Sequence, residues 1–226
     1  MSSWEPKSLD EFNRSVVECD KCPRLVRYRA LVAERKPPRF KEWDYWSRPL
    51  PGFGDPLARI LILGLAPAAH GGNRTGRMFT GDSSGEFLFG SLFRCGLSNK
   101  PTSERPGDGL LVTGVYITAA LRCVPPKNLP TRDELDNCFV HLNTEFRLLP
   151  NIRVIVALGA IAYDAARRLV DAPRSKFAHG ALVDAGGLKI LASYHPSRRN
   201  TQTGLLTSDM IDQVFEKAKQ IAGLSN

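Results

Sequence analysis

The sequence has no hydrophobic run of the roughly 20 residues that a membrane-spanning helix requires. Residues 1–6 lack a positive region followed by an apolar one, so no secretory leader is expected. Internal repeats, low-complexity stretches and a clear domain boundary are missing as well. The 226 residues suffice for one domain with a full core. We therefore expect a single cytoplasmic domain over residues 1–226, with no membrane partner.

Cysteine is scarce, and its five copies do not fall into disulfide-like pairs, which argues against a secreted disulfide framework. Four of the five are nevertheless informative. Cys19 and Cys22 form a C-x2-C pair, whereas Cys123 and Cys138 follow a hundred residues later. Four thiolates can complete the shell of a zinc ion or of an iron–sulfur cluster. A redox dithiol at the pair, with two buried hydrophobic cysteines elsewhere, is the alternative.

The fifth cysteine, Cys95, has a different environment. With Leu88 and Leu92 it falls on one face of a helix expected over residues 83–96. We therefore interpret Cys95 as a core residue.

Charge is unevenly distributed along the chain, whose net charge is +8. Between Lys21 and Arg48 there are nine basic residues and three acidic ones, interleaved with five Tyr, Phe and Trp residues. Basic side chains mixed with aromatics suit a polyanion with flat faces, which indicates nucleic acid. A solvated surface loop is the alternative for this proline-containing connection, which we expect to continue to about residue 56.

Four apolar runs predict buried strands, at 59–65, 114–121, 154–158 and 189–194. Helical patterns lie between and after them, and a capping-box pattern at Ser8 predicts a first helix that ends near Cys19. Alternating buried strands and helices predict an α/β fold with a mainly parallel, four-stranded sheet covered on both faces. The further helices are expected at 83–96, from Thr131 to about Phe146, at 160–170 and at 208–222.

Two loops should meet at the carboxyl edge of this sheet, where open parallel sheets bind ligands. The loop over 64–77 is rich in Gly and Ala, so its backbone N–H groups can approach a ligand closely, although it is neither G-x-G-x-x-G nor a Walker A sequence. The other loop carries His195-Pro196-Ser197. His70 and His195 are therefore candidate ligand contacts, with a structural histidine as the alternative for each.

Residues 81–85 fit the G-x-S-x-G pattern of a serine hydrolase. That motif needs a buried strand directly before it, whereas the preceding residues 74–80 are polar and contain glycine. We interpret Asp82 as the N-cap of a helix instead.

Four segments together resemble the uracil-DNA glycosylase superfamily, and most closely its fifth, B-type family, which contains an iron–sulfur cluster. They are 64–71, 76–82, 123–128 with Cys138, and 195–197, and the resemblance extends from Cys19 to Thr207. It implies a doubly wound, three-layer α/β/α fold and a monofunctional DNA glycosylase that acts on deaminated bases in double-stranded DNA. It also implies a [4Fe–4S] cluster on Cys19, Cys22, Cys123 and Cys138 that attaches segment 1–56, where the residues alone leave zinc open. We expect a monomer.

The resemblance also assigns roles to single residues. Phe79 corresponds to the aromatic that stacks on the extruded base, and His195 to the residue that faces the pyrimidine O2. The base pocket is expected to include Gly64, Ala66, Pro67, Ala68, His70, Phe79 and Ser197. Two usual groups are missing: the first loop has Leu65, Ala66 and Ala68 where sister families have a water-orienting polar residue, and residues 118–120 lack their base-reading Asn.

Water must then be held by another side chain. Asn128 is the first candidate, Asn73 the second, and Asp82 a possible carboxylate. Arg198 and Arg199 suit DNA phosphates, and residues around Gln202 and Leu205 suit insertion into the vacated stack. An ordinary loop is the alternative for this last segment. A non-catalytic iron–sulfur DNA-binding protein and an iron–sulfur electron carrier are the rival functions.

Overall fold

The computed structural model describes residues 6–224, and residues 1–5, on which the expectation of no leader rests, lie outside it. Its centre is a six-stranded sheet of order β1-β3-β2-β4-β6-β5. Four of the strands are those expected from the sequence: β2 (Ile60–Gly64), β3 (Val115–Ala119), β4 (Val154–Leu158) and β6 (Leu188–Ser193). They pair in parallel, and β2, β3 and β4 are buried along their whole length. These strands appear in the sequence as unbroken apolar runs because both faces of the sheet are covered.

The expectation of four strands was wrong by two. Both additional strands are antiparallel and lie at the edges of the sheet: β1 (Phe53–Gly54) and β5 (Leu182–Ala185). β1 has only two residues, and β5 alternates between exposed and half-buried positions. Neither leaves an apolar run in the sequence, so hydrophobicity alone does not reveal them.

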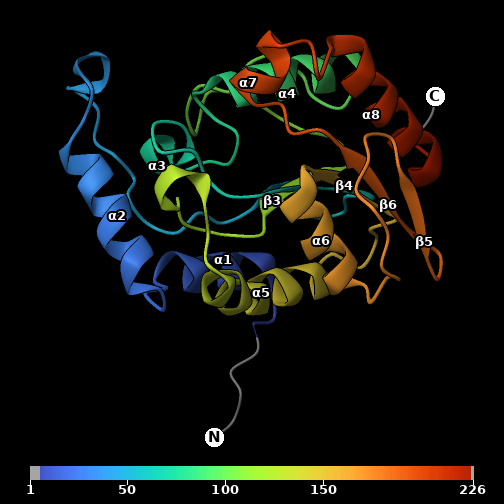
Figure 1. Cartoon of the computed structure of the whole chain (residues 1–226), viewed down its shortest axis with the longest axis horizontal. Helices are drawn as coiled ribbons and strands as arrows, with labels where there is room; N and C mark the ends of the chain where they lie inside the picture. Colours follow the sequence, from blue (N-terminus) through green and yellow to red (C-terminus); the bar gives the residue numbers. More distant parts are fainter. Residues whose placement is uncertain (1–5, 225–226) are drawn as a thin grey trace, which may run out of the picture.

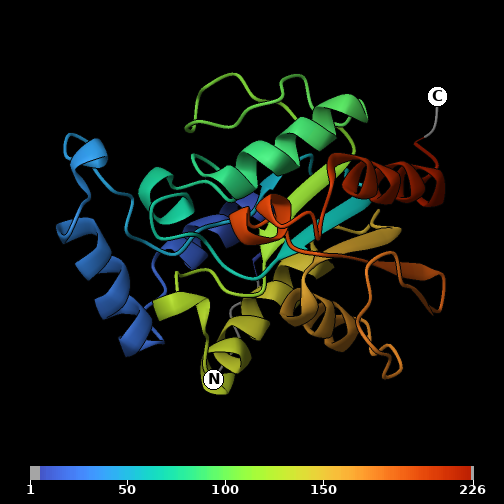
Figure 2. The same cartoon turned by 45° about the horizontal axis from the view of Figure 1, so that its top comes forward.

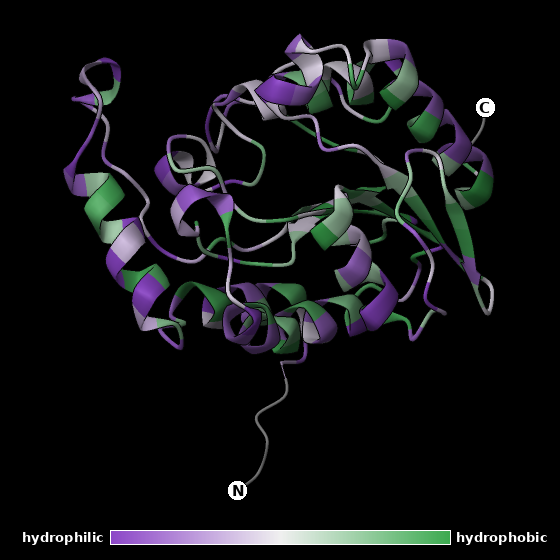
Figure 3. Ribbon diagram, in the orientation of Figure 1, coloured by the Kyte–Doolittle hydropathy of each residue, from purple (hydrophilic) through white to green (hydrophobic). Residues whose placement is uncertain are grey.

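Helices cover both faces of the sheet, as the sequence predicts (Figure 1). α1 (Leu9–Val17), α5 (Arg132–Arg147) and α6 (Ala160–Leu169) lie on one face, and α4 (Ser83–Arg94) and α8 (Ser208–Ala222) on the other. Thr131 and Glu134 form the full capping box of α5. Figure 3 shows hydrophobic residues along the sheet and on the inner sides of these helices, as a three-layer fold requires.

A further helix, α2 (Pro23–Glu34), occupies part of the segment expected to be a basic connection. It stands to one side of the layered core in both views (Figures 1 and 2). Pro23 begins it at a position where the missing N–H costs nothing. In the sequence, the arginines of α2 interrupt its apolar positions, so its amphipathic pattern is weak. Four short helices complete the fold: η1 (Pro38–Phe40), α3 (Gly72–Thr75), η2 (Pro126–Asn128) and α7 (Arg198–Gln202).

The cap at the start of α1 is simpler than expected. Ser8 accepts the N–H of Glu11, but the Glu11 carboxylate accepts the N–H of Lys7 instead of completing a capping box with Ser8. Within residues 6–224, no helix is both long and apolar enough to span a membrane.

Candidate functional site

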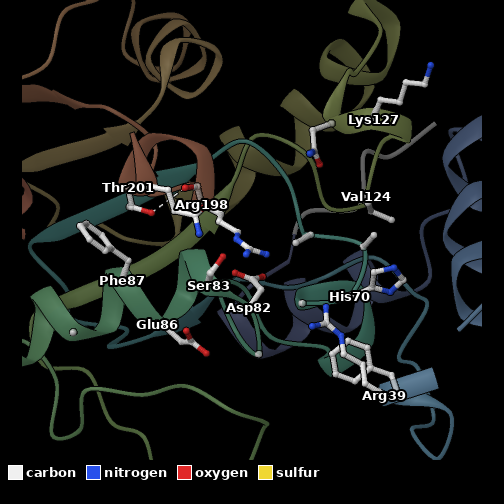
Figure 4. Close-up of a pocket in the computed structure, with 18 of the residues that line it drawn as sticks. Arg39, His70, Asp82, Ser83, Glu86, Phe87, Val124, Lys127, Arg198 and Thr201 are labelled. Carbon is white, nitrogen blue, oxygen red and sulfur yellow. Dashed lines mark hydrogen bonds between the residues drawn. The ribbon is translucent and has the colours of Figure 1, made fainter. Parts of the chain in front are cut away.

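A cleft of about 1000 Å³ opens at the carboxyl edge of the sheet (Figure 4). The parallel register brings the ends of β2 and β3, and of β4 and β6, to this same edge. The cleft walls come mainly from five regions that are distant in sequence: the η1 segment, the loop after β2, α4 with the residues just before it, the segment after Cys123, and α7. The structure therefore brings together the two loops that the sequence singled out.

Phe79 lies at the base of this edge in a left-handed backbone conformation, with φ of 50°. A side chain at Gly64 would meet the Phe79 ring at 2.7 Å, and one at Gly85 would meet its carbonyl oxygen at 1.9 Å. Both glycines are therefore required for the position of this ring. The ring centroid is 6.0 Å from that of His195. Strain held at a non-glycine residue is typical of functional sites.

His195 follows β6, and its environment keeps the imidazole neutral. Burial lowers the pKa of His195 to about 4. Its carbonyl accepts hydrogen bonds from the Ser197 N–H and from Asn200 Nδ2, at 2.8 and 2.9 Å. Ser197 also caps α7 by accepting the Asn200 N–H. The backbone that carries His195 is thus anchored, and its ring is neutral near pH 7.

His179, which no sequence motif singles out, supports the strand end that carries His195. Its Nδ1 accepts the N–H of Tyr194 at 3.2 Å, and the two rings stack at 5.1 Å. No sequence pattern connects residues 179 and 194, because the antiparallel β5–β6 pairing that joins them was not expected.

Asp82 is the N-cap of α4, as predicted, but it also lines the cleft. One carboxylate oxygen accepts the N–H groups of Ser84 and Gly85. The other lies against Gly71, where an added Cβ would approach it to 1.8 Å. The pKa of Asp82 is raised, mainly by burial, although the two backbone hydrogen bonds and Arg74 act to lower it. The sequence suggested two roles for Asp82, a helix N-cap and a carboxylate that holds water. Its position at the start of α4 and on the cleft wall is compatible with both.

The two asparagine candidates for holding water lie in different places. Asn128 is exposed and lines the cleft, and it follows Lys127 in two successive left-handed conformations, with φ of 55° and 56°. Asn73 is buried outside the lining, and its Nδ2 donates to the Arg29 carbonyl. The geometry therefore favours Asn128, and Asn73 instead anchors α2 to the loop after β2.

In that loop, Ala68 and His70 line the cleft, whereas Ala66 and Pro67 pack behind it. His70 Nδ1 lies 3.0 Å from the hydroxyl of Tyr45. Burial lowers the pKa of His70, and the charges of Arg39 and Arg74 lower it further. His70 therefore also presents a neutral ring to the cleft.

α7 forms the opposite wall. Arg198 and Gln202 line the cleft, and Arg199 is exposed on the same short helix. Leu205 follows α7 with 46% of its surface exposed, whereas its neighbour Leu206 is buried. An exposed leucine beside two arginines fits a segment that inserts into a duplex.

The four cysteines Cys19, Cys22, Cys123 and Cys138 line one small cavity between α2, α5 and the segment after β3. Each sulfur faces a nitrogen: Asn137 Nδ2 at Cys22, Arg29 Nη1 at Cys123, the Arg122 N–H at Cys138, and His141 Nε2 at Cys19. The distances are between 3.1 and 3.7 Å. All four are free thiols, as is Cys95, which is buried in the core as expected. In the described part of the chain, no set of three or more His, Cys, Asp or Glu residues is placed to hold a single metal ion.

His141 of α5 belongs to the surroundings of the cysteine cavity. It is half-buried beside Cys19, and its ring packs 6.3 Å from that of Phe12. Helical spacing from Cys138 places it on this side, but only the packing of α1 against α5 covers it.

Comparison with known proteins shows the family to which this chain belongs. Residues 51–219 match the family model described as the uracil DNA glycosylase superfamily, and the chain belongs to that superfamily. It is 53% identical to the type-5 uracil-DNA glycosylase of Thermus thermophilus over 95% of this chain and 99% of that one. It is 48% identical to the type-5 enzyme of Pyrobaculum aerophilum over 95% and 93%, and 31% identical to the type-4 enzyme of Thermotoga maritima over 74% and 80%. Within the superfamily, it fits the fifth family.

Proposed function

We propose that this protein is a DNA-repair hydrolase that cleaves the N-glycosidic bond of uracil in DNA and leaves an abasic site. The observation that carries the proposal is the Phe79–His195 pair at the strand ends, with an aromatic face and a neutral N–H donor beside a basic cleft. The test is a duplex with one labelled uracil. We expect strand cleavage only after alkali treatment, because a monofunctional enzyme leaves the backbone intact.

The base must leave the stack before any side chain reaches its glycosidic bond. Phe79 offers a face on which the extruded base can stack, and the missing side chain at Gly64 lets this ring lie against the end of β2. His195 then donates a hydrogen bond to the pyrimidine O2. Negative charge develops on the base as it departs, so this donor stabilises the transition state more than the bound substrate.

Water must attack the sugar on the side opposite the departing base. Asn128 is a neutral amide on the cleft wall and is suited to orient that water. Asp82 lines the same cleft, and its carboxylate is suited to stabilise the positive charge that develops on the sugar. We infer that these two residues replace the polar group missing from the first loop.

Duplex DNA is the partner that the charges of the cleft favour. Arg39, Lys127 and Arg198 line it, and Arg199 adds to the α7 side. We infer a monomer acting in the cytoplasm, since one copy supplies all parts of the cleft. A non-catalytic DNA-binding protein would have the same charges but no need for the Phe79–His195 pair.

Replacing Arg198 and Arg199 together with alanine should weaken the salt dependence of DNA binding. Each phosphate contact contributes about 0.9 to the slope of log affinity against log salt. The slope is measured by fluorescence anisotropy between low and moderate salt. We expect a decrease of about 1 to 2, and an unchanged slope would move both arginines off the interface.

Activity should extend beyond uracil, with hypoxanthine as the most favoured second base. Ala119 is the last residue of β3 and Ala120 follows it, at the positions where a base-reading amide is expected. Both alanines are buried. A pocket that relies on shape and stacking rejects analogues weakly, whereas one with matched hydrogen bonds rejects them strongly. Single-turnover excision from uracil and hypoxanthine duplexes measures the difference, and strict uracil specificity would contradict this account.

We propose that Cys19, Cys22, Cys123 and Cys138 hold a [4Fe–4S] cluster. Two observations support it: one cavity collects the four sulfurs, and three of the sulfurs have an N–H group within reach while the fourth, Cys19, has the His141 ring nitrogen beside it. Such N–H groups stabilise the negative charge of ligated thiolates and tune iron–sulfur sites. When bound, the cluster would serve as a structural cross-link between the start of the chain and the cleft.

Zinc is the alternative occupant, because a zinc ion accepts the same four thiolates, each at about 2.3 Å. Within residues 6–224 no set of three or more such ligands is placed around a single ion, so analysis of the metal content decides between the two. Because Val124 and Pro125 follow Cys123 directly and line the cleft, the cluster would also position the wall that carries Asn128.

A further inference from the structure

Arg74 has an environment that DNA binding alone does not explain. It lies in α3, only 4% of its surface is exposed, and both of its hydrogen-bond acceptors are backbone carbonyls. Nε donates to the carbonyl of His70 at 2.7 Å, and Nη2 donates to the carbonyl of Gly81 at 2.9 Å. One guanidinium therefore joins the loop after β2 to the residue that precedes Asp82.

The N-terminal segment encloses this guanidinium with two aromatic rings. Its central carbon lies 4.1 Å from the centroid of Phe40 and 4.0 Å from that of Trp43. The backbone of the same segment is attached as well, because the Trp46 N–H donates to the Arg74 carbonyl. Arginine suits such a position because its planar face stacks on rings while its edge donates hydrogen bonds.

Gly81 shows how closely the guanidinium fits. A Cβ at this position would lie 2.3 Å from Arg74 Nη2, and φ of Gly81 is +75°. The next residue is Asp82, which starts α4 and faces the cleft. A shift of Arg74 would therefore be transmitted directly to the backbone of Asp82.

Several charged groups surround Asp82. Burial is the largest influence on the pKa of Asp82 and leaves it raised. The backbone hydrogen bonds of α4 lower it, Glu86 on α4 raises it further, and Arg74 lowers it. Arg39 of the η1 segment, Arg94 of α4 and Arg198 of α7 line the same cleft. Arg74 differs from these arginines because its side chain is buried and backbone carbonyls of the two cleft loops hold its guanidinium.

We propose that Arg74 is a positioning residue of the glycosylase site: it joins the two cleft loops and holds Asp82 in place next to a positive charge, with Phe40 and Trp43 as its clamp. The proposal rests on the proposed function, since Asp82 acts here as a carboxylate toward the sugar. It gives the aromatic residues of the N-terminal segment a role in the chemical step as well as in DNA binding.

The test is the pH profile of single-turnover uracil excision at saturating enzyme, with DNA affinity measured separately. We expect Arg74→Met to lower the rate at neutral pH about tenfold or more, because a small displacement of a catalytic group has a large kinetic cost. DNA affinity should change less than about threefold, since the side chain is covered. The acid limb of the profile should move to higher pH, because a carboxylate without its neighbouring cation ionises at higher pH.

Arg74→Lys is the conservative variant, which keeps the charge but loses the planar fork. Its acid limb should remain near that of the unchanged protein, and its rate should lie between those of the unchanged protein and Arg74→Met. Arg39→Met removes an exposed cation at the same cleft and should weaken DNA binding without moving the acid limb. Circular dichroism checks folding, and should Arg74→Met not fold, Arg74→Lys and Trp43→Leu carry the same comparison.

An acid limb and rate that stay unchanged in Arg74→Met, with uracil excised normally, would overturn the positioning role. Equal acid shifts in Arg74→Met and Arg74→Lys would also contradict it, because charge would then not matter. Failure of the unchanged protein to release uracil would instead refute the proposed function, so the two outcomes are distinct.

Discussion

Replacing His195 with alanine is expected to slow uracil release by about 100- to 1000-fold, the usual cost of removing a donor that stabilises transition-state charge. Affinity for uracil-containing DNA should change much less, since the hydrogen bond strengthens only as the base departs. Single-turnover rates at saturating enzyme, with binding measured by anisotropy, separate the two effects. Release at the full rate would refute the role of His195.

His195→Gln is the matched control, because the amide keeps an N–H donor and should retain part of the rate. The pH dependence gives a second check. Burial lowers the pKa of His195 to about 4, so the ring is neutral above that pH and becomes charged only below it. Between pH 5.5 and 8, roughly, the rate should therefore show no inflection from this ring near the ordinary histidine value of about 6.5. Such an inflection, absent from His195→Gln, would contradict a neutral donor.

Replacing Cys123 or Cys138 with serine is expected to remove the brown colour of the purified protein and to lower its solubility. The unchanged protein should show broad absorbance near about 400 nm and contain about four irons per chain. With the proposed cluster bound, loss of one ligand would open the connection between α5, the segment after β3 and the C-x2-C pair. Absorbance and iron content after anaerobic purification measure the effect.

Cys95→Ser is the control, because Cys95 packs in the main core and points its sulfur toward the Asp212 carbonyl. It should keep both colour and iron. Colourless protein with one tightly bound zinc per chain would contradict the iron–sulfur proposal, and colour that survives both ligand replacements would remove Cys123 and Cys138 from the site.

The sequence predicted the layers of this fold well, for a physical reason. β2, β3 and β4 are buried on both faces, so each appears as an unbroken apolar run. The edge strands β1 and β5 do not, because one is two residues long and the other is half exposed. α2 was missed because its arginines interrupt a weak apolar pattern, in which only Leu25 and Val32 are buried.

Single residues of the site were predictable from motifs, but the contacts between segments distant in sequence were not. His195, Asp82 and Asn128 were named from motifs, and all lie at one edge of the sheet. Arg74 was not named, because its role depends on rings about 30 residues earlier that only the folded chain brings to it. Asn73 shows the reverse: its residue type suited water binding, but burial directs its amide to the Arg29 carbonyl.

The most direct test of the whole account is the release of free uracil from a duplex that carries one labelled uracil. With excess protein, we predict that free base appears together with alkali-sensitive sites in equal amounts, and that the strand stays intact before alkali. The His195→Ala protein should bind the same duplex and release base far more slowly. Binding of the duplex by the unchanged protein with no free uracil and no alkali-sensitive sites would contradict the account and leave a DNA-binding protein without this chemistry.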